Sequence, residues 1–280
     1  MDDGVGNLGG KEPGKMTLLD RIVADKKAEV AAAANNVPEH GLRSMIDDRP
    51  WQSRGFERRL CGPGPGGVNI IAEVKRASPS KGDICVDLDA VECARQYETG
   101  GAAAVSVLTD APYFKGCLED LRRVREAVGL PVLRKEFIID PYQLYESRAA
   151  GADAVLLIAR ILSPAQLKEL LALTHELGMD ALVEIHSAED YAAAHDAGSR
   201  LIGINNRNLA NFDTDLRTAL GLKALLQPNE VPVAASGIHC REDIVRNLEG
   251  GIFNFLIGES LVRAKDRAAM LRSLTGKAME

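Results

Sequence analysis

The sequence lacks the features that identify membrane proteins and disulfide-rich secreted proteins. No apolar run approaches the ~20 residues that a transmembrane helix needs. The five cysteines are odd in number, and no two of them form the C-x-x-C pair that is typical of metal and redox sites. Isolated thiols fit a reducing compartment, so we predict a cytoplasmic protein that does not bind membranes.

The sequence also lacks an excess of positive charge and lacks residues spaced as metal ligands. The formal net charge of -6 argues against nucleic acid or an anionic membrane as the main partner. A local basic pocket for a small anionic substrate remains compatible with that charge. No cluster of His, Cys, Asp and Glu has the spacing of metal ligands, so the sequence predicts no metal.

The chain begins with a segment that has no pattern of a folded element. Residues 1–15 are polar and rich in glycine, without the apolar core of a secretion signal, and we predict a disordered tail. The first helical pattern begins directly after Met16, so this methionine is a candidate for the true start of the protein.

An N-terminal helical extension is predicted over residues 16–66. Thr17–Asn36 places apolar residues on one helical face with charges between them, and a second short helix is predicted near His40–Asp47. The segment Cys61–Val68, which is rich in glycine and proline, is predicted to be a loop that ends this extension.

Residues 67–275 repeat one pattern, in which a short apolar run is followed by a loop and an amphipathic helix. Eight such strand–helix units closing on themselves make a (β/α)8 TIM barrel, which we predict. An open doubly wound sheet is the competing architecture, but the first run is not followed by its G-x-G-x-x-G fingerprint. The eight apolar runs are Asn69–Lys75, Ala103–Leu108, Pro131–Lys135, Ala154–Ile158, Ala181–Ile185, Leu201–Asn205, Val231–Ser236 and Phe253–Gly258.

Charged residues lie at the ends of several predicted strands. Side chains alternate along a strand, so Ile71, Glu73 and Lys75 share one face of the first run. Lys135 ends the third run and Glu184 ends the fifth. Chemistry in such barrels takes place at the C-terminal strand ends, so these groups are predicted to form an acid/base set. A structural ion pair at the rim, a solvated lysine at a strand end and a carboxylate paired with a loop are the alternatives.

Small residues end the last two predicted strands. Ser236-Gly237 and Gly258-Glu259 are predicted to expose backbone amides that hold a phosphate, with simple turn chemistry as the alternative. His186 follows Glu184 by two residues, but a lone histidine is not specific for catalysis, so it is assigned to no site.

The sequence resembles the indole-3-glycerol phosphate synthase family. The segment IIAEVKRASPSKG looks like the family signature, and the likeness continues through SVLTDAPYFKG, ALVEIHS, IGINNRNL and FLIGESLV, from about Thr17 to Lys265. The resemblance implies a carboxy-lyase that needs no cofactor. Its substrate is 1-(2-carboxyphenylamino)-1-deoxyribulose 5-phosphate, which closes a ring and loses CO₂ and water. A monomer or weak homodimer is predicted.

The resemblance also implies a role for each site residue. Lys135 is the general acid of ring closure, Glu184 orients it or accepts protons, and Glu73 with Lys75 transfers protons in the dehydration. The remaining residues implied are Asn205 and Arg207 in ordering the network, Ser78 at the anionic end of the substrate, Phe114, Phe137 and Leu156 as apolar walls, and Ser236, Gly237, Gly258 and Glu259 around the phosphate.

One position departs from the family pattern. The family usually has Glu-Ser-Gly after the seventh strand, whereas this chain has Ala235-Ser236-Gly237. Loss of one carboxylate from a charged network can cost ~3 kcal/mol, or about a hundredfold in rate. A catalytically weakened phosphate-binding barrel and a related phosphosugar barrel enzyme are therefore the alternative functions.

Overall fold

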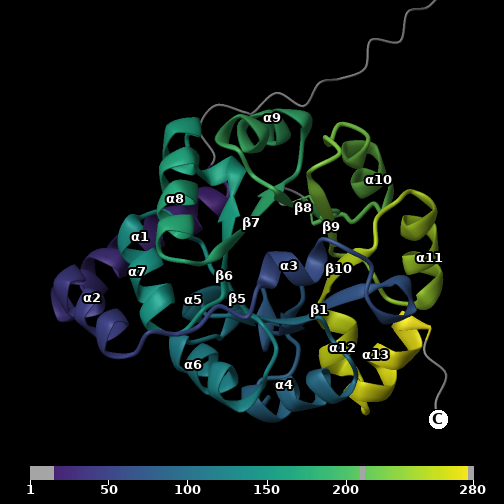
Figure 1. Ribbon diagram of the computed structural model, residues 1–280, viewed down its shortest axis with the longest axis horizontal. Helices are drawn as coiled ribbons and strands as arrows, with labels where there is room; N and C mark the ends of the chain where they lie inside the picture. Colours follow the sequence, from purple (N-terminus) through teal and green to yellow (C-terminus); the bar gives the residue numbers. More distant parts are fainter. Residues whose placement is uncertain (1–15, 209–211, 277–280) are drawn as a thin grey trace, which may run out of the picture.

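A computed structural model describes residues 16–208 and 212–276 of the chain, and the predicted tail lies outside these residues. Parallel strands close into a barrel in the order β1-β10-β9-β8-β7-β6-β5-β4, which confirms the predicted TIM barrel (Figure 1). Its strands are β1 (Asn69–Val74), β4 (Ala104–Leu108), β5 (Val132–Lys135), β6 (Ala154–Ile158), β7 (Asp180–Ile185), β8 (Leu201–Asn205), β9 (Val231–Ala235) and β10 (Asn254–Ile257).

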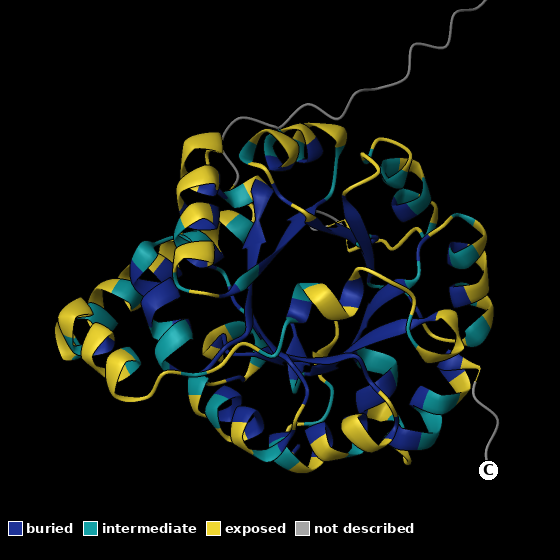
Figure 2. Cartoon of the chain, viewed as in Figure 1, coloured by how far each residue is buried: buried dark blue, intermediate teal, exposed yellow. Residues whose placement is uncertain are grey.

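Helices follow the strands and form the outer layer of the barrel. Their outward faces are exposed while the strands are buried (Figure 2). Several begin with a side-chain cap, such as Ser163 before α8. The helices that connect or follow the barrel strands are α4 (Ala90–Thr99), α5 (Ala111–Phe114), α6 (Leu118–Ala127), α7 (Pro141–Ala149), η2 (Ala159–Ile161), α8 (Pro164–Glu176), α9 (Ala188–Ala197), α10 (Arg217–Lys223), α11 (Arg241–Glu249), α12 (Glu259–Arg263) and α13 (Arg267–Thr275).

The two faces of β1 bury their side chains in different clusters. Ile71 packs in the cluster that fills the barrel with Leu133 and Leu182, whereas Ile70 and Ala72 pack in the larger cluster between strands and helices. Inward residues above Ile71 therefore open onto the C-terminal mouth of the barrel. A two-stranded hairpin of β2 (Ala77–Ser78) and β3 (Gly82–Asp83) follows β1 at that mouth.

The residues before the barrel form α1 (Leu18–Asn36), α2 (Glu39–Asp48), α3 (Phe56–Leu60) and the short turn η1 (Pro65–Gly67). The sequence did not predict α3, which lies at the N-terminal end of the barrel. Phe56 and Leu60 are fully buried in the inner cluster, and the backbone amide of Glu57 donates to Asp180 at the start of β7. This helix fills the end of the barrel that lies opposite the predicted site.

Within the part of the chain that the structure describes, no helix is both long and apolar enough to cross a membrane.

Candidate active site

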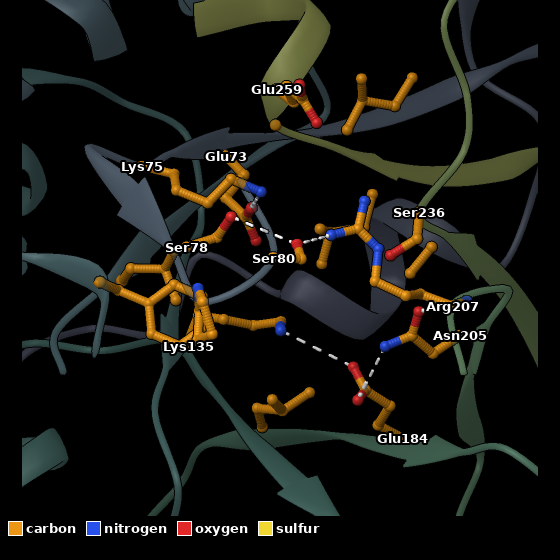
Figure 3. Close-up of a pocket in the computed structure, with 18 of the residues that line it drawn as sticks. Glu73, Lys75, Ser78, Ser80, Lys135, Glu184, Asn205, Arg207, Ser236 and Glu259 are labelled. Atoms are coloured by element: carbon orange, nitrogen blue, oxygen red, sulfur yellow. Dashed lines mark hydrogen bonds and ion pairs between the residues drawn. The ribbon is translucent and has the colours of Figure 1, made fainter. Parts of the chain in front are cut away.

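All residues that the sequence assigned to a site line one pocket at the C-terminal ends of the strands (Figure 3). They come from β1 and its following loop, from the segment after β4, from the ends of β5 to β8, and from the turns after β9 and β10. Strand ends that are far apart in the sequence meet here because the parallel strands of a closed barrel all end on the same side.

Glu73 and Lys75 form an ion pair inside this pocket. The Lys75 Nζ lies 2.9 Å from Glu73 Oε1, and the Lys75 and Glu73 side chains are 16% and 5% exposed. Burial pushes the pKa of Glu73 upward, but the positive charges of Lys75, Lys135 and Arg207 outweigh it and hold this pKa below its usual value. The pair thus presents an ionised carboxylate and an ammonium group to the pocket interior rather than to solvent.

Lys135 and Glu184 face one another across the pocket. The Lys135 Nζ lies 3.7 Å from Glu184 Oε2, and Asn205 Nδ2 donates to Glu184 Oε1 at 3.2 Å. The Lys135 side chain is 18% exposed, so it is not a solvated strand end. Burial raises the pKa of Glu184, but Lys135, His186 and the Asn205 hydrogen bond together bring it below its usual value.

Arg207 joins the loop after β8 to the loop after β1. Its backbone amide donates to Asn205 Oδ1 at 3.0 Å, and its guanidinium donates to Ser80 Oγ, which in turn lies 3.5 Å from Ser78 Oγ. Figure 3 shows the guanidinium pointing across the pocket mouth toward Ser80. Ser80 was not assigned by sequence, although it belongs to the same Ser-Pro-Ser loop as Ser78.

The turns after β9 and β10 have backbones that tolerate only small residues. Ser236 and Gly237 have φ values of 68° and 79°, and a methyl group on Gly237 would lie 2.5 Å from Thr214 Cγ2. A methyl group on Gly258 would lie 2.5 Å from Glu73 Oε1, so a glycine there leaves room for the ion pair. The short helix α12 begins directly after Gly258, which is the arrangement of phosphate sites in many TIM barrels.

Apolar side chains form the opposite part of the pocket. The rings of Phe114 and Phe137 lie 6.1 Å apart at an angle of 42°. Helix α1 adds three further lining residues, namely Leu18, Leu19 and Ile22, which the sequence placed in the extension but not in the site. The helical pattern of α1 indicated an apolar face without showing what that face covers.

Lys26 is a deeply buried charge that the sequence pattern did not reveal. Its side chain is 3% exposed, and its Nζ lies 2.7 Å from Glu29 Oε2 and 3.0 Å from both Asp110 Oδ2 and Glu136 Oε1. Asp110 follows β4 and Glu136 directly follows Lys135. This cluster fixes α1 to the strand ends beside the pocket.

Comparison with known proteins decides the family. The family model described as "Indole-3-glycerol phosphate synthase" matches residues 19–274. Proteins of that name from Desulfosudis oleivorans and Syntrophobacter fumaroxidans are 55% and 52% identical, over 92% of this chain and 98% and 97% of theirs. The chain belongs to the indole-3-glycerol phosphate synthase family.

Solved structures with little sequence identity share the fold. A thiamine phosphate pyrophosphorylase from Pyrococcus furiosus is 15% identical with a TM-score of 0.57, covering 78% of this chain and 96% of that one. The tryptophan synthase α subunit of Legionella pneumophila is 14% identical with a TM-score of 0.56, covering 81% and 98%. At this identity the likeness concerns the barrel alone.

Ala235 occupies the position where the resemblance led us to expect a family carboxylate. It is 6% exposed, lines the pocket and lies in register with Asn205 of β8 and Leu256 of β10. Neither register neighbour is a carboxylate, so neither replaces the missing charge. Glu136 and Glu259 also line the pocket, but Glu136 pairs with Lys26 and Glu259 lies 4.0 Å from Lys81. The carboxylates that face Lys75 and Lys135 are therefore Glu73 and Glu184.

In residues 16–208 and 212–276 we find no group of three or more His, Cys, Asp and Glu side chains that could hold a metal ion.

Proposed function

We propose that the protein is an indole-3-glycerol phosphate synthase that acts on 1-(2-carboxyphenylamino)-1-deoxyribulose 5-phosphate. The observation that carries this proposal is the Lys135–Glu184 pair facing the Glu73–Lys75 pair across one pocket, in a chain of this family. Two separate pairs suit a reaction that needs proton transfer at more than one atom of the substrate.

Ring closure is assigned to Lys135. Its ammonium group donates a proton to the substrate carbonyl oxygen while the aryl carbon attacks the carbonyl carbon. The carboxylate then leaves the ring carbon as CO₂, and the bonding electrons neutralise the iminium group that ring closure produced. Glu184 lies 3.7 Å from Lys135, and its largely buried carboxylate orients the ammonium group toward the substrate.

Dehydration is assigned to Glu73 and Lys75. The hydroxyl group leaves with a proton from Lys75, and Glu73 removes the proton from the carbon next to the ring nitrogen. The lowered pKa of Glu73 keeps it ionised and able to accept that proton. Asn205 and Arg207 order the groups around both pairs, since Asn205 donates a hydrogen bond to Glu184 and Arg207 donates one to Ser80.

Binding is assigned to the remaining pocket residues. The turns at Ser236-Gly237 and Gly258-Glu259 hold the phosphate, and Ser78 contacts the anionic end of the substrate. The tilted pair Phe114 and Phe137 contacts the aromatic ring, together with Leu156. Because one chain supplies the whole pocket, we propose that the protein works as a monomer or weak homodimer, without a cofactor and in the cytoplasm.

The test compares Lys135→Met with the wild type in an assay of indole-3-glycerol phosphate formation. We expect a loss of kcat of at least about a hundredfold, because a general acid contributes ~10²–10⁴-fold. Lys168→Met, on the exposed face of α8, is the matched control and should keep the wild-type rate. A wild-type protein that forms no product above background would contradict the proposed function.

A further inference from the structure

His186 is a buried imidazole placed directly behind Glu184. It follows β7, its side chain is 4% exposed, and it does not line the pocket. Neither ring nitrogen has a hydrogen-bond partner among the described residues, although each faces a carboxylate. The Nε2 lies 3.5 Å from Glu184 Oε1, and the Nδ1 lies 3.8 Å from Asp190 Oδ2. Buried polar atoms without partners are rare, so this arrangement points to a role other than packing.

The imidazole stands in a row of ionisable groups that leads out of the pocket. Lys135 faces Glu184, Glu184 faces His186, and His186 faces Asp190, which pairs with Arg160 at 3.1 Å. The Arg160 side chain is 37% exposed, so the row ends at solvent. A second, polar hollow is lined by Arg160, His186, Asn205, Asn206, Arg207, Asn208, Asp213, Asp215 and Thr218.

The proposed reaction consumes one proton per turnover, so it needs a way to return protons to the site. Protons enter at the carbonyl oxygen and at the leaving hydroxyl group, and one proton leaves from carbon. Lys135 therefore becomes a neutral amine in each turnover and has to recover a proton before the next one, and a route behind Glu184 lets it do so while product still occupies the pocket in front of it.

We propose that His186 relays that proton to Lys135 through Glu184. The Nδ1 of His186 takes up a proton from water, and the Nε2 gives its proton to Glu184 Oε1. The carboxyl group then rotates about its Cγ–Cδ bond, so that the proton received on Oε1 faces the Lys135 amine, and transfers it there, which restores the ammonium group and the carboxylate. The imidazole regains its first tautomer by exchange with water. His186 acts through Glu184, so it is a positioning and relay residue, and its role rests on the proposed function.

The charges around the row favour this direction of transfer. Burial raises the pKa of Glu184, and the Lys135 charge is the first factor that opposes this. Once Lys135 has lost its proton, burial is no longer opposed by that charge and the protonated carboxyl group becomes easier to form. Burial lowers the pKa of His186, so the resting ring is neutral and can donate from one nitrogen while accepting at the other.

His186→Gln separates relay from orientation. Its amide can still donate a hydrogen bond to Glu184, but it cannot accept a proton on one side and release another. With enzyme in excess, each enzyme molecule turns over once and needs no proton returned, so the single-turnover rate should stay within about threefold of wild type. Under multiple turnover, kcat should fall at least about tenfold and show a larger solvent deuterium effect than wild type. His195→Gln, an exposed histidine of α9, is the matched control and should change neither rate.

The other possible results contradict either the relay alone or both the relay and the proposed function. Equal losses in the single-turnover rate and in kcat, or no loss in either, would overturn the relay while leaving the proposed function standing. A wild-type protein without product formation would overturn both. If His186→Gln melts below the assay temperature, His186→Asn is measured in the same way, with the same outcomes.

Discussion

Two carboxylates in the pocket are buried in ionised form because each of them pairs with a lysine. Glu73 and Glu184 are each about 4% exposed, where an isolated carboxylate would favour its neutral form. Each faces a lysine instead, and the pKa of each lies below its ordinary value despite burial. Ala235 adds no further carboxylate beside Lys75 and Lys135, so Glu73 and Glu184 are the carboxylates that pair with these two lysines.

Ala235→Glu tests whether the missing carboxylate limits the rate. The residue lines the pocket, so the longer side chain can extend into open space beside Asn205. We expect kcat to rise by about tenfold or more with KM nearly unchanged, because ~1.4 kcal/mol of added transition-state stabilisation is a factor of ten. Ala235→Gln adds the same bulk without charge and serves as control. Equal kcat values for all three proteins would show that Glu73 and Glu184 already suffice.

Among the elements, helix α1 has the most direct connection to the site. Its apolar residues line the pocket, and Lys26 joins it to Asp110 and Glu136 at the ends of β4 and β5. Glu136 also accepts a hydrogen bond from Thr109 at 2.7 Å. The extension is thus part of the pocket wall, held there by charges that are almost fully removed from solvent.

Lys26→Met should detach α1 from the strand ends. Removing one partner of a buried ion pair leaves uncompensated charge and costs about 3–5 kcal/mol of the free energy of unfolding. We expect that loss in denaturant titration, together with a higher KM as the pocket wall loosens. Lys27→Met, on the exposed side of the same helix, is the matched control and should change stability by no more than about 0.5 kcal/mol. Similar effects of the two substitutions would contradict the role of the Lys26 cluster.

The whole molecule has buried carboxylates whose charge is needed for the fold. Glu73, Glu136 and Glu184 each have a folded pKa below the reference value of 4.5. A lowered folded pKa stabilises the protein above the unfolded pKa, and that stabilisation is lost as pH falls through the folded value. Asp153, whose pKa burial raises, acts in the opposite sense but is a single group.

Stability should therefore fall steeply in acid. We expect a shallow decrease in the free energy of unfolding below about pH 6.5, because burial lowers the pKa of His186. Below about pH 4.5 a steeper decrease follows, with a slope of up to about 4 kcal/mol per pH unit for the three carboxylates. Denaturant titrations at several pH values measure this directly. A free energy of unfolding that stays level down to about pH 3 would show that these carboxylates are not held by their partners in solution.

The barrel strands could be predicted closely, because each apolar run has a length and a spacing that only strand–helix units explain. Both ends of every predicted run lie within one residue of the observed strand end. Helix α3 escaped prediction, because a segment of five residues is too short to show periodicity. The burial of Lys26 was not predicted, because a lysine within a helical pattern is expected to be exposed until its partners are known.

The sequence alone was enough to predict which chemical group ends each strand: a Glu-x-Lys pair, a lone lysine, a second glutamate and two turns of small residues. This was possible because side-chain alternation and strand ends are local properties. The pairing of these groups depends on the folded barrel, in which Lys75 pairs with Glu73, Lys135 with Glu184, and Lys26 with Asp110 and Glu136. Most of those contacts join segments far apart in the chain, and barrel closure with the docking of α1 brings them within reach.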